Sequence, residues 1–206
     1  MKQHLLEYLV CPTSGSQLRL EASRCDGDEI IKGLLISLEG RQYPVRNGIP
    51  RFVSSEEYTN TFGFQWNTHA RIYFDDKDKY RLHSTYDQLQ QKLGLCPENV
   101  RRKTVLDIGC GTGANAAATA EWGAHEVFCV DLSSAVEAAY SNTKQLDNVH
   151  VIQADLFKLP FNQASFDIIY SIGVLHHTPE TAKPFFTGSL FEREWCYRNL
   201  GIPGLS

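Results

Sequence analysis

The stretch that decides the fold of this 206-residue chain is Val105-Leu106-Asp107-Ile108-Gly109-Cys110-Gly111-Thr112-Gly113. It joins an apolar segment, which predicts a buried strand over 104–108, to an alanine-rich segment that predicts a helix over 114–122. Glycines at such a junction let the backbone approach a ligand closely and leave the first amide groups of the helix accessible. The stretch therefore predicts a ligand-binding loop between a strand and a helix.

Apolar runs and helical patterns alternate after this loop. Strands are predicted at 126–130, 149–152 and 166–171, and a helix that opens with a capping box at Ser134 is predicted to run towards Leu146. Strands that alternate with helices predict a parallel sheet with helices on both faces. The expected fold class is α/β, a Rossmann-like doubly wound parallel sheet that stops after its fourth strand, with a small β-rich domain before it.

Three aspartates stand at the ends of successive predicted strands. Asp107 precedes the glycine loop, Asp131 ends the second strand and Asp155 follows the third. Because parallel strands end at one edge of the sheet, these carboxylates are expected to converge on one crevice. There Asp131 can accept hydrogen bonds from both hydroxyls of a ribose, and Asp155 can accept from the amine of an adenine while Leu156 packs on the ring. The alternative for each aspartate taken alone is a capping or strand-end role.

A nicotinamide-dependent oxidoreductase is one alternative for such a loop, because those enzymes also use a glycine-rich turn. Here the spacing is G-x-G-x-G, and Asn115 stands where the dinucleotide pattern has its last glycine. Asp107 would also place negative charge beside a pyrophosphate. Both features disfavour that class.

Four segments resemble successive motifs of the class I S-adenosylmethionine-dependent methyltransferases, and most closely the subgroup that includes quinone-biosynthesis enzymes. They are VLDIGCGTG (105–113), VDLSSAVEAA (130–139), QADLFKLPF (153–161) and FDIIYSIGVLHH (166–177). The resemblance implies S-adenosyl-L-methionine as cofactor and methyl transfer to a small-molecule or lipid-like acceptor. It implies that Asp107 lies near the amino group of the cofactor, Gly109, Gly111 and Gly113 along its methionine part, Asp131 and Leu132 at its ribose, and Asp155 and Leu156 at its adenine.

Candidates for catalysis itself are few. His176 and His177 follow the fourth predicted strand, where a substrate would lie, and His176 is the candidate general base. The alternative is that this segment only turns the chain into the next helix. Phe64 and Trp66 are candidate walls of a substrate pocket, or else ordinary core aromatics.

Residues 1–53 predict the small β-rich domain, with a short opening helix, a strand at 34–38 and a tight turn at Asn47-Gly48. LLEYLVCP and YPVRNGIPRFV resemble zinc-ribbon-like domains that are fused to, or partnered with, methyltransferases. Cys11 has Ser14 where the resemblance would place a second cysteine, and Ile36 and Glu39 stand near the place of the later pair. We therefore expect no metal there and predict a structural or docking module.

Residues 54–100 are predicted to form a helical connector or cap, with a helix ending near Gly94. Residues 101–206 are predicted to form the cofactor-binding domain. The resemblance stops near Phe186, before the last three strands of a complete class I sheet, and a frameshift or early stop is our hypothesis for this pattern. The fourth strand would then be an exposed edge, which predicts weak stability and self-association through that edge. A catalytically inactive remnant that binds cofactor, or acts as an interaction module, is the alternative function.

Composition and charge narrow the possible classes of function. The net charge of −4 and the pI of about 6.0 argue against a surface that binds nucleic acid by neutralising phosphates. No apolar stretch is long enough to cross a bilayer, and the N-terminal apolar run is too short for a signal peptide, so a cytoplasmic protein is expected. Six cysteines without a C-x-x-C pair predict free thiols rather than a disulfide framework.

Overall fold

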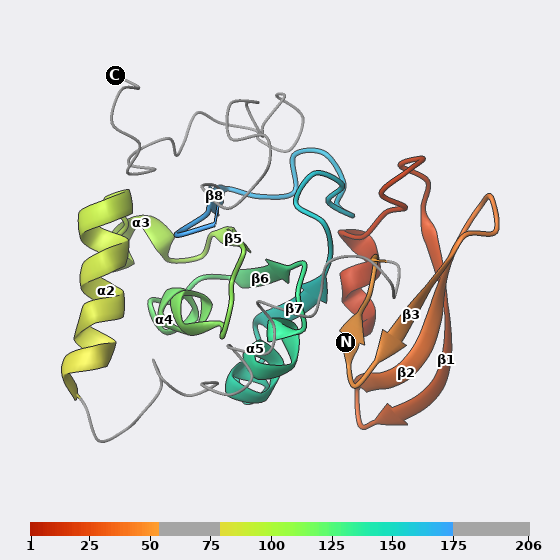
Figure 1. Cartoon of the computed structure of the whole chain (residues 1–206), viewed down its shortest axis with the longest axis horizontal. Helices are drawn as coiled ribbons and strands as arrows, with labels where there is room; N and C mark the ends of the chain where they lie inside the picture. Colours follow the sequence, from red (N-terminus) through yellow and green to blue (C-terminus); the bar gives the residue numbers. More distant parts are fainter. Residues whose placement is uncertain (54–78, 175–206) are drawn as a thin grey trace.

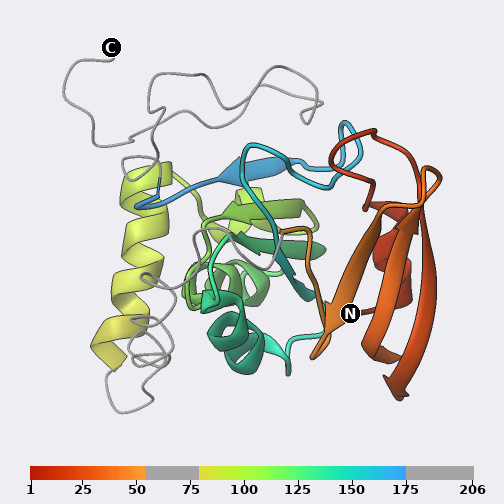
Figure 2. The ribbon, with the colours of Figure 1, turned by 45° about the vertical axis from the view of Figure 1, so that its right-hand side comes forward.

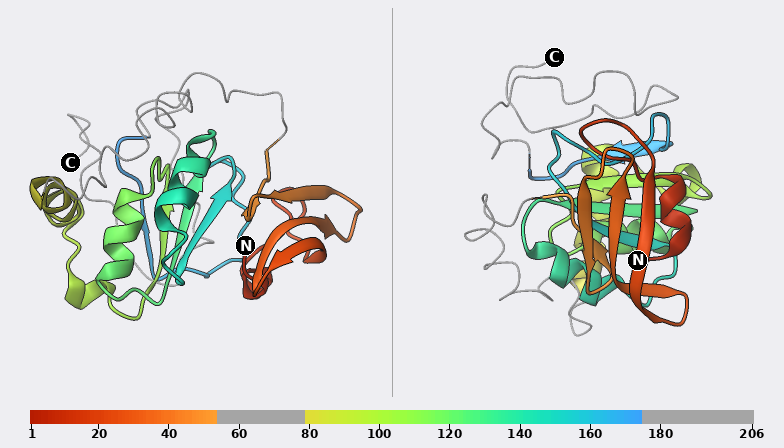
Figure 3. Two further views of the ribbon diagram at one scale, coloured as in Figure 1. Left: turned by 90° about the horizontal axis from the view of Figure 1, so that it is seen from below. Right: turned by 90° about the vertical axis from the view of Figure 1, so that its right-hand side faces the viewer.

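The computed structural model describes residues 1–53 and 79–174, with side chains described from residue 85 onward in the second range. Two four-stranded sheets organise these residues, one antiparallel and one parallel (Figure 1). The antiparallel sheet and the helix over 79–93 lie at opposite ends of the molecule, with the parallel sheet between them (Figures 2 and 3). No helix among the described residues combines the length and the apolar character that a membrane crossing requires.

The N-terminal unit, residues 1–53, opens with a short 3-10 helix and continues as four antiparallel strands in chain order. Its elements are η1 (Gln3–Glu7), β1 (Leu18–Asp26), β2 (Glu29–Ser37), β3 (Gln42–Arg46) and β4 (Ile49–Pro50). The predicted turn is confirmed, with positive φ angles of 53° at Asn47 and 79° at Gly48. The strand expected at 34–38 begins earlier, at Glu29, and β1 was not predicted because it is exposed over most of its length.

The parallel sheet has the strand order β7-β6-β5-β8. Its strands and helices are β5 (Thr104–Ile108), α4 (Ala114–Glu121), β6 (Glu126–Asp131), α5 (Ala135–Thr143), β7 (Val149–Gln153) and β8 (Ile168–Tyr170). It is preceded by α2 (Lys79–Leu93) and α3 (Pro97–Val100), and α2 ends where Gly94 was expected to end it, with φ +67°. In the register of the sheet, Asp107 lies between Cys129 of β6 and Tyr170 of β8.

The start of α5 differs from its prediction. Ser134 makes no side-chain capping bond, so the expected capping box is wrong. Ser133 takes that role, because its hydroxyl oxygen accepts a bond from the Ala135 amide at 3.2 Å while its own proton is donated to Asp131. The candidate partner in the box, Glu137, forms an ion pair with Arg51 instead.

The two faces of the parallel sheet have different coverings. Along β6, Val127 and Cys129 belong to a cluster with the alanines of α4 and α5, whereas Phe128 and Val130 belong to a second cluster. That second cluster contains side chains of the N-terminal unit: Met1, Leu5, Leu9, Cys11, Leu18, Ile30, Leu35 and Val45. In the described part, therefore, the face where a second layer of helices was expected packs against the N-terminal unit.

Phe128 is the centre of this second cluster. It is fully buried, and its ring lies 4.8 Å from Tyr8, 5.3 Å from Phe166 and 5.6 Å from Phe161, measured between ring centroids. Backbone bonds reinforce the packing: the Val10 amide donates to the Pro160 carbonyl at 2.9 Å, and the Phe52 amide donates to the Gln153 carbonyl at 2.8 Å. Residues 1–53 and the parallel sheet thus share one hydrophobic core.

Candidate functional site

The loop between β5 and α4 is held in a conformation that needs glycine. Gly109, Gly111 and Gly113 have φ angles of 75°, 53° and 82°. The Gly109 and Cys110 amides both donate to the Val130 carbonyl, at 2.7 and 3.1 Å, which ties the loop to β6. A Cβ atom at Gly109 would lie 2.1 Å from Val174, so the loop has no space for a side chain there. The predicted strand–loop–helix junction is confirmed, and the conformation accounts for its glycines.

Asp131 connects this loop to the end of β6. Its Oδ2 accepts from the Gly111 amide at 3.0 Å, and its Oδ1 accepts from the Ser133 amide at 2.9 Å and hydroxyl at 2.7 Å. A carboxylate offers about four lone-pair positions, so roughly one remains, on Oδ2. That position suits one ligand hydroxyl. For Asp131 to accept from both hydroxyls of a ribose, as expected, the Ser133 hydroxyl would have to give up its place.

Asp107 is the most perturbed carboxyl group of the site. Its side chain is 1% exposed, and Oδ2 has no hydrogen-bond partner. Burial raises the pKa of Asp107 to about 8, a hydrogen bond from Tyr170 opposes that rise, and the charge of Asp131 adds to it. An orphaned buried acceptor costs roughly 1–3 kcal/mol, so a cationic amine placed against Oδ2 would be strongly favoured.

Tyr170 and Thr119 form the support of Asp107 and were missed by the sequence interpretation. Their hydroxyl oxygens lie 3.1 Å apart, and the Thr119 hydroxyl donates its proton to the Asn115 carbonyl at 2.7 Å. Burial raises the pKa of Tyr170 well above its usual value, so this hydroxyl keeps its proton. A tyrosine in a strand and a threonine in a helix carry no local signal that they meet.

The carboxyl end of β7 differs from those of β5 and β6 in its contacts. Asp155 is half-buried, and its Oδ1 accepts from the Phe157 amide at 2.9 Å, which orders the turn after β7. Leu156 is half-buried against the second core cluster. The Leu132 carbonyl accepts from the Gln153 side chain at 3.0 Å, which joins the ends of β6 and β7. Thus Asp107, Asp131 and Asp155 stand at the carboxyl ends of three neighbouring strands, as predicted.

Several candidates lie outside the described residues. They are the candidate base His176, its neighbour His177, and the candidate pocket aromatics Phe64 and Trp66. Their proposed roles remain predictions.

In the N-terminal unit, the residues that the zinc-ribbon resemblance singled out lie on two facing turns. The hydroxyls of Ser14 and Ser16 both donate to Glu39 Oε2 at 2.9 Å, and the Cys11 sulfur lies 3.2 Å from the Tyr43 hydroxyl. The bond from Ser16 is the main cause that lowers the pKa of Glu39 to about 2. Hydrogen bonds therefore join the two turns, and the expected lack of metal there stays a prediction.

The parallel-sheet half is similar to known proteins. Residues 105–190 match a family model described as a methyltransferase domain. This part of the chain is therefore similar to methyltransferase domains. Among curated relatives, O-methyltransferase rstn1 of Aspergillus nomiae is 30% identical over 112 residues, which cover 51% of this chain and 49% of that protein. The 27-O-demethylrifamycin SV methyltransferase of Amycolatopsis mediterranei is 31% identical over 114 residues, covering 52% and 41%. The chain thus spans about half or less of the length of these relatives.

Among solved structures, a putative S-adenosyl-L-methionine-dependent methyltransferase of Methanococcus maripaludis is similar with a TM-score of 0.46. It is 21% identical, and the match covers 61% of this chain and 57% of that one.

The cofactor that this similarity implies is S-adenosyl-L-methionine. The side chains of the site fit it. Asp107 Oδ2 is a buried acceptor without a partner, which suits the ammonium group of the methionine part. Asp131 has an acceptor position left for a hydroxyl. The expected α/β fold class is confirmed.

Proposed function

We propose that this chain binds S-adenosyl-L-methionine in the crevice at the carboxyl ends of β5, β6 and β7 and transfers its methyl group to a small-molecule or lipid-like acceptor. The observation that carries the proposal is the orphaned carboxyl oxygen of Asp107, buried directly before a glycine loop that is bonded to Asp131. A nucleotide-binding loop for pyrophosphate would gain nothing from a buried acid at that place.

The proposed roles are those that the resemblance to class I methyltransferases implies, and the contacts of Asp107 and Asp131 support two of them. Asp107 accepts from the ammonium group, and Gly109, Gly111 and Gly113 run along the methionine part. Asp131 and Leu132 contact the ribose. Asp155 and Leu156 contact the adenine. When bound, the cofactor supplies an activated methyl group, so the chain's own task is to hold it, exclude water and align the acceptor.

The acceptor class rests on the relatives and on the sequence. One relative is named as an O-methyltransferase and another as a 27-O-demethylrifamycin SV methyltransferase. Two others are named as a protein arginine N-methyltransferase and a sterol 24-C-methyltransferase. We favour a small organic or lipid-like acceptor with a hydroxyl or carbon nucleophile, deprotonated by His176 where the nucleophile carries a proton. A screen of methyl acceptors with radiolabelled cofactor tests this part separately.

A second candidate function is cofactor binding without turnover, in an interaction module. The observation that favours it is that β8, among the described residues, pairs with β5 alone. An uncovered strand edge is a template for association with another chain, which includes a second copy of this one. Sedimentation of the full chain at several concentrations tests this: a concentration-independent monomer contradicts self-association through β8.

Calorimetric titration with S-adenosylhomocysteine tests cofactor binding. We expect micromolar affinity, and at least tenfold weaker binding by Asp107→Asn, which keeps the shape of the side chain and removes the charge. Asp87→Asn, at an exposed position of α2, is the matched control and should bind like the unmodified chain. A folded protein that does not bind, or an Asp107→Asn variant that binds normally, contradicts the proposed site.

A further inference from the structure

Three side chains from separate segments meet at the opposite end of the parallel sheet. They are His4 of η1, Glu126 at the start of β6 and His150 near the start of β7. Because β6 runs from Glu126 to Asp131, this cluster lies about 16 Å from the proposed cofactor crevice, at roughly 3.3 Å per residue. It is therefore independent of the proposed function.

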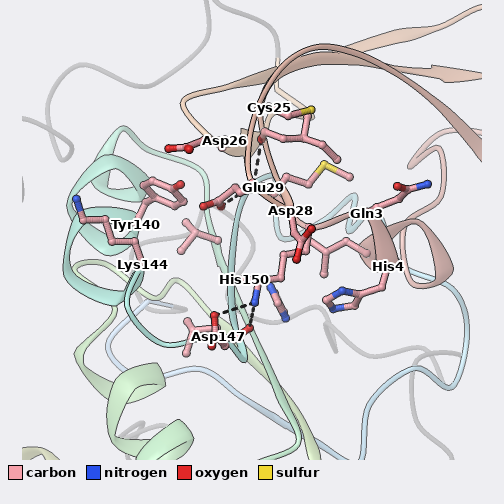
Figure 4. A pocket seen from close by; sticks show the side chains of 18 of the residues that line it. Gln3, His4, Cys25, Asp26, Asp28, Glu29, Tyr140, Lys144, Asp147 and His150 are labelled. Atoms are coloured by element: carbon pink, nitrogen blue, oxygen red, sulfur yellow. Dashed lines mark hydrogen bonds and ion pairs between the residues drawn. The ribbon is translucent and has the colours of Figure 1, made fainter.

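The cluster borders a cavity of about 620 Å³ (Figure 4). The cavity is lined by η1, the turn between β1 and β2, the end of α5 and the start of β7. Figure 4 shows the imidazoles of His4 and His150 next to each other, and their ring centroids are 5.2 Å apart, edge to face. Four carboxylates also line this cavity: Asp26, Asp28, Glu29 and Asp147. Glu29 is ion-paired with the N-terminal ammonium group and Asp147 with Lys2, so the lining is mixed in charge.

The donor atoms of the cluster converge on one point. His4 Nε2 lies 3.3 Å from Glu126 Oε1, and His150 Nε2 contacts Glu126 Oε2. One ligand atom from each of the three residues lies within 4.8 Å of the others. His4 Nε2 is shielded from solvent, yet it has no hydrogen-bond partner. One carboxylate therefore faces two imidazole nitrogens and satisfies only one of them by a hydrogen bond.

We propose that His4, Glu126 and His150 bind one divalent transition-metal ion, with zinc as the preferred ion, and that this ion ties the N-terminal segment to the parallel sheet. Two imidazoles and a carboxylate are zinc ligands, and the fourth tetrahedral position would face the cavity and hold water. Ligand atoms around tetrahedral zinc lie about 3.3 Å from one another, given metal–ligand distances near 2.0–2.1 Å. The His4–Glu126 distance already has that value.

Metal binding needs a neutral imidazole and an ionised carboxylate. The side chains of His150 and Glu126 are only 3% and 15% exposed, so an ion held between them would be shielded from water. His4 is partly exposed, with 39% of its side chain accessible, and can adjust to the ion.

Zinc titration of the full chain without an affinity tag tests the proposal. We expect one Zn²⁺ per chain and a melting temperature that rises by roughly 5–10 °C when free zinc is a hundred times its Kd. His4→Gln should bind zinc at least tenfold more weakly and lose the rise. His125→Gln is the matched control, because His125 is exposed directly beside Glu126, and it should bind zinc normally.

His4 is the primary position because His150 is buried and its replacement can prevent folding. Nitrogen NMR shifts of the imidazoles add a local measurement: zinc should move the Nε2 signals of His4 and His150 but not that of His125. The proposal is overturned if the chain does not bind zinc. It is also overturned if His4→Gln binds normally while Cys11→Ser does not, since the metal would then lie at a thiol.

Discussion

The Gly111 amide donates a 3.0 Å hydrogen bond to Asp131 Oδ2. This bond joins the loop after β5 to the end of β6, so the carboxylate that is proposed to meet the ribose also shapes the loop proposed to meet the methionine part. The same carboxylate holds Ser133, which in turn caps α5 through the Ala135 amide. The bonds of Asp131 therefore tie together the glycine loop, the end of β6 and the start of α5.

Replacing Asp131 should affect both stability and cofactor binding. Asp131→Ala leaves the Gly111 amide and both Ser133 donors without their acceptor, and we expect the free energy of unfolding to fall by about 1–3 kcal/mol. S-adenosylhomocysteine should bind at least tenfold more weakly. Asp131→Asn keeps one acceptor oxygen, so its stability and its affinity should lie between those of the unmodified chain and those of Asp131→Ala. Urea unfolding and calorimetry measure both effects, and unchanged binding by folded Asp131→Ala would contradict the proposed ribose contact.

A side chain at Gly109 should lower the free energy of unfolding more than a side chain at another glycine with a similar φ angle. Gly109 and Gly15 have φ angles of +75° and +71°, but only at Gly109 would a Cβ collide, 2.1 Å from Val174. Both alanine variants bear the cost of a left-handed conformation, about 1–2 kcal/mol. Gly109→Ala should lose about 1–3 kcal/mol more because of the collision. Equal losses in urea unfolding would show that the loop can relax.

The pKa of about 8 at Asp107 predicts an unusual dependence of stability on pH. The ordinary pKa of an aspartate is near 3.8, so the folded protein without ligand holds this proton more tightly than the unfolded chain does. Stability from this group is full below pH 4 and is lost as the pH rises to about 8. Asp107→Asn should remove that decline. Urea unfolding at pH 5, 7 and 8.5 compares the two proteins, and parallel curves would show that Asp107 is already ionised.

The same group predicts release of a proton when the cofactor binds. At pH 7 Asp107 is mostly protonated, whereas a carboxylate is needed to pair with the ammonium group of the methionine part. Binding of S-adenosylhomocysteine should release close to one proton at pH 7 and fewer at pH 9. Calorimetry in buffers of different ionisation enthalpy counts the protons. Asp107→Asn serves as the control, and equal proton release by it would assign the proton to another group.

Phe128 should be critical for the attachment of the N-terminal unit. Its ring is fully buried between Tyr8, Phe161 and Phe166. Phe128→Ala should cost about 3–5 kcal/mol in the free energy of unfolding. Phe157→Ala, at a position that is 46% exposed, should cost under about 1 kcal/mol. A loss of similar size in both variants would mean that the shared core contributes little.

Zinc binding at His4, Glu126 and His150 depends on the same attachment. The two imidazoles and the carboxylate meet only while η1 lies against the starts of β6 and β7. The Phe128 ring also packs on the His150 ring, with centroids 5.3 Å apart, so Phe128→Ala should weaken zinc binding as well as the attachment.

Much of the proposed cofactor site could be predicted from the sequence. The glycine loop and the positions of Asp107, Asp131 and Asp155 follow from contiguous residues, because strand and helix periodicity and the need for positive φ are local properties. Once a parallel sheet is inferred, its geometry brings the strand ends to one edge. The Asn47-Gly48 turn was predictable for the same local reason.

Tertiary structure decided the rest. The position of the N-terminal unit on the sheet, the support of Asp107 by Tyr170, and the meeting of His4 with Glu126 and His150 join segments that are distant in the chain. The choice of Ser133 over Ser134 at the start of α5 also depends on where the Asp131 carboxylate lies in space. By itself the sequence determined which backbone conformations each segment adopts. Only packing decided which side chains share buried space, because burial and pKa depend on neighbours that local patterns do not encode.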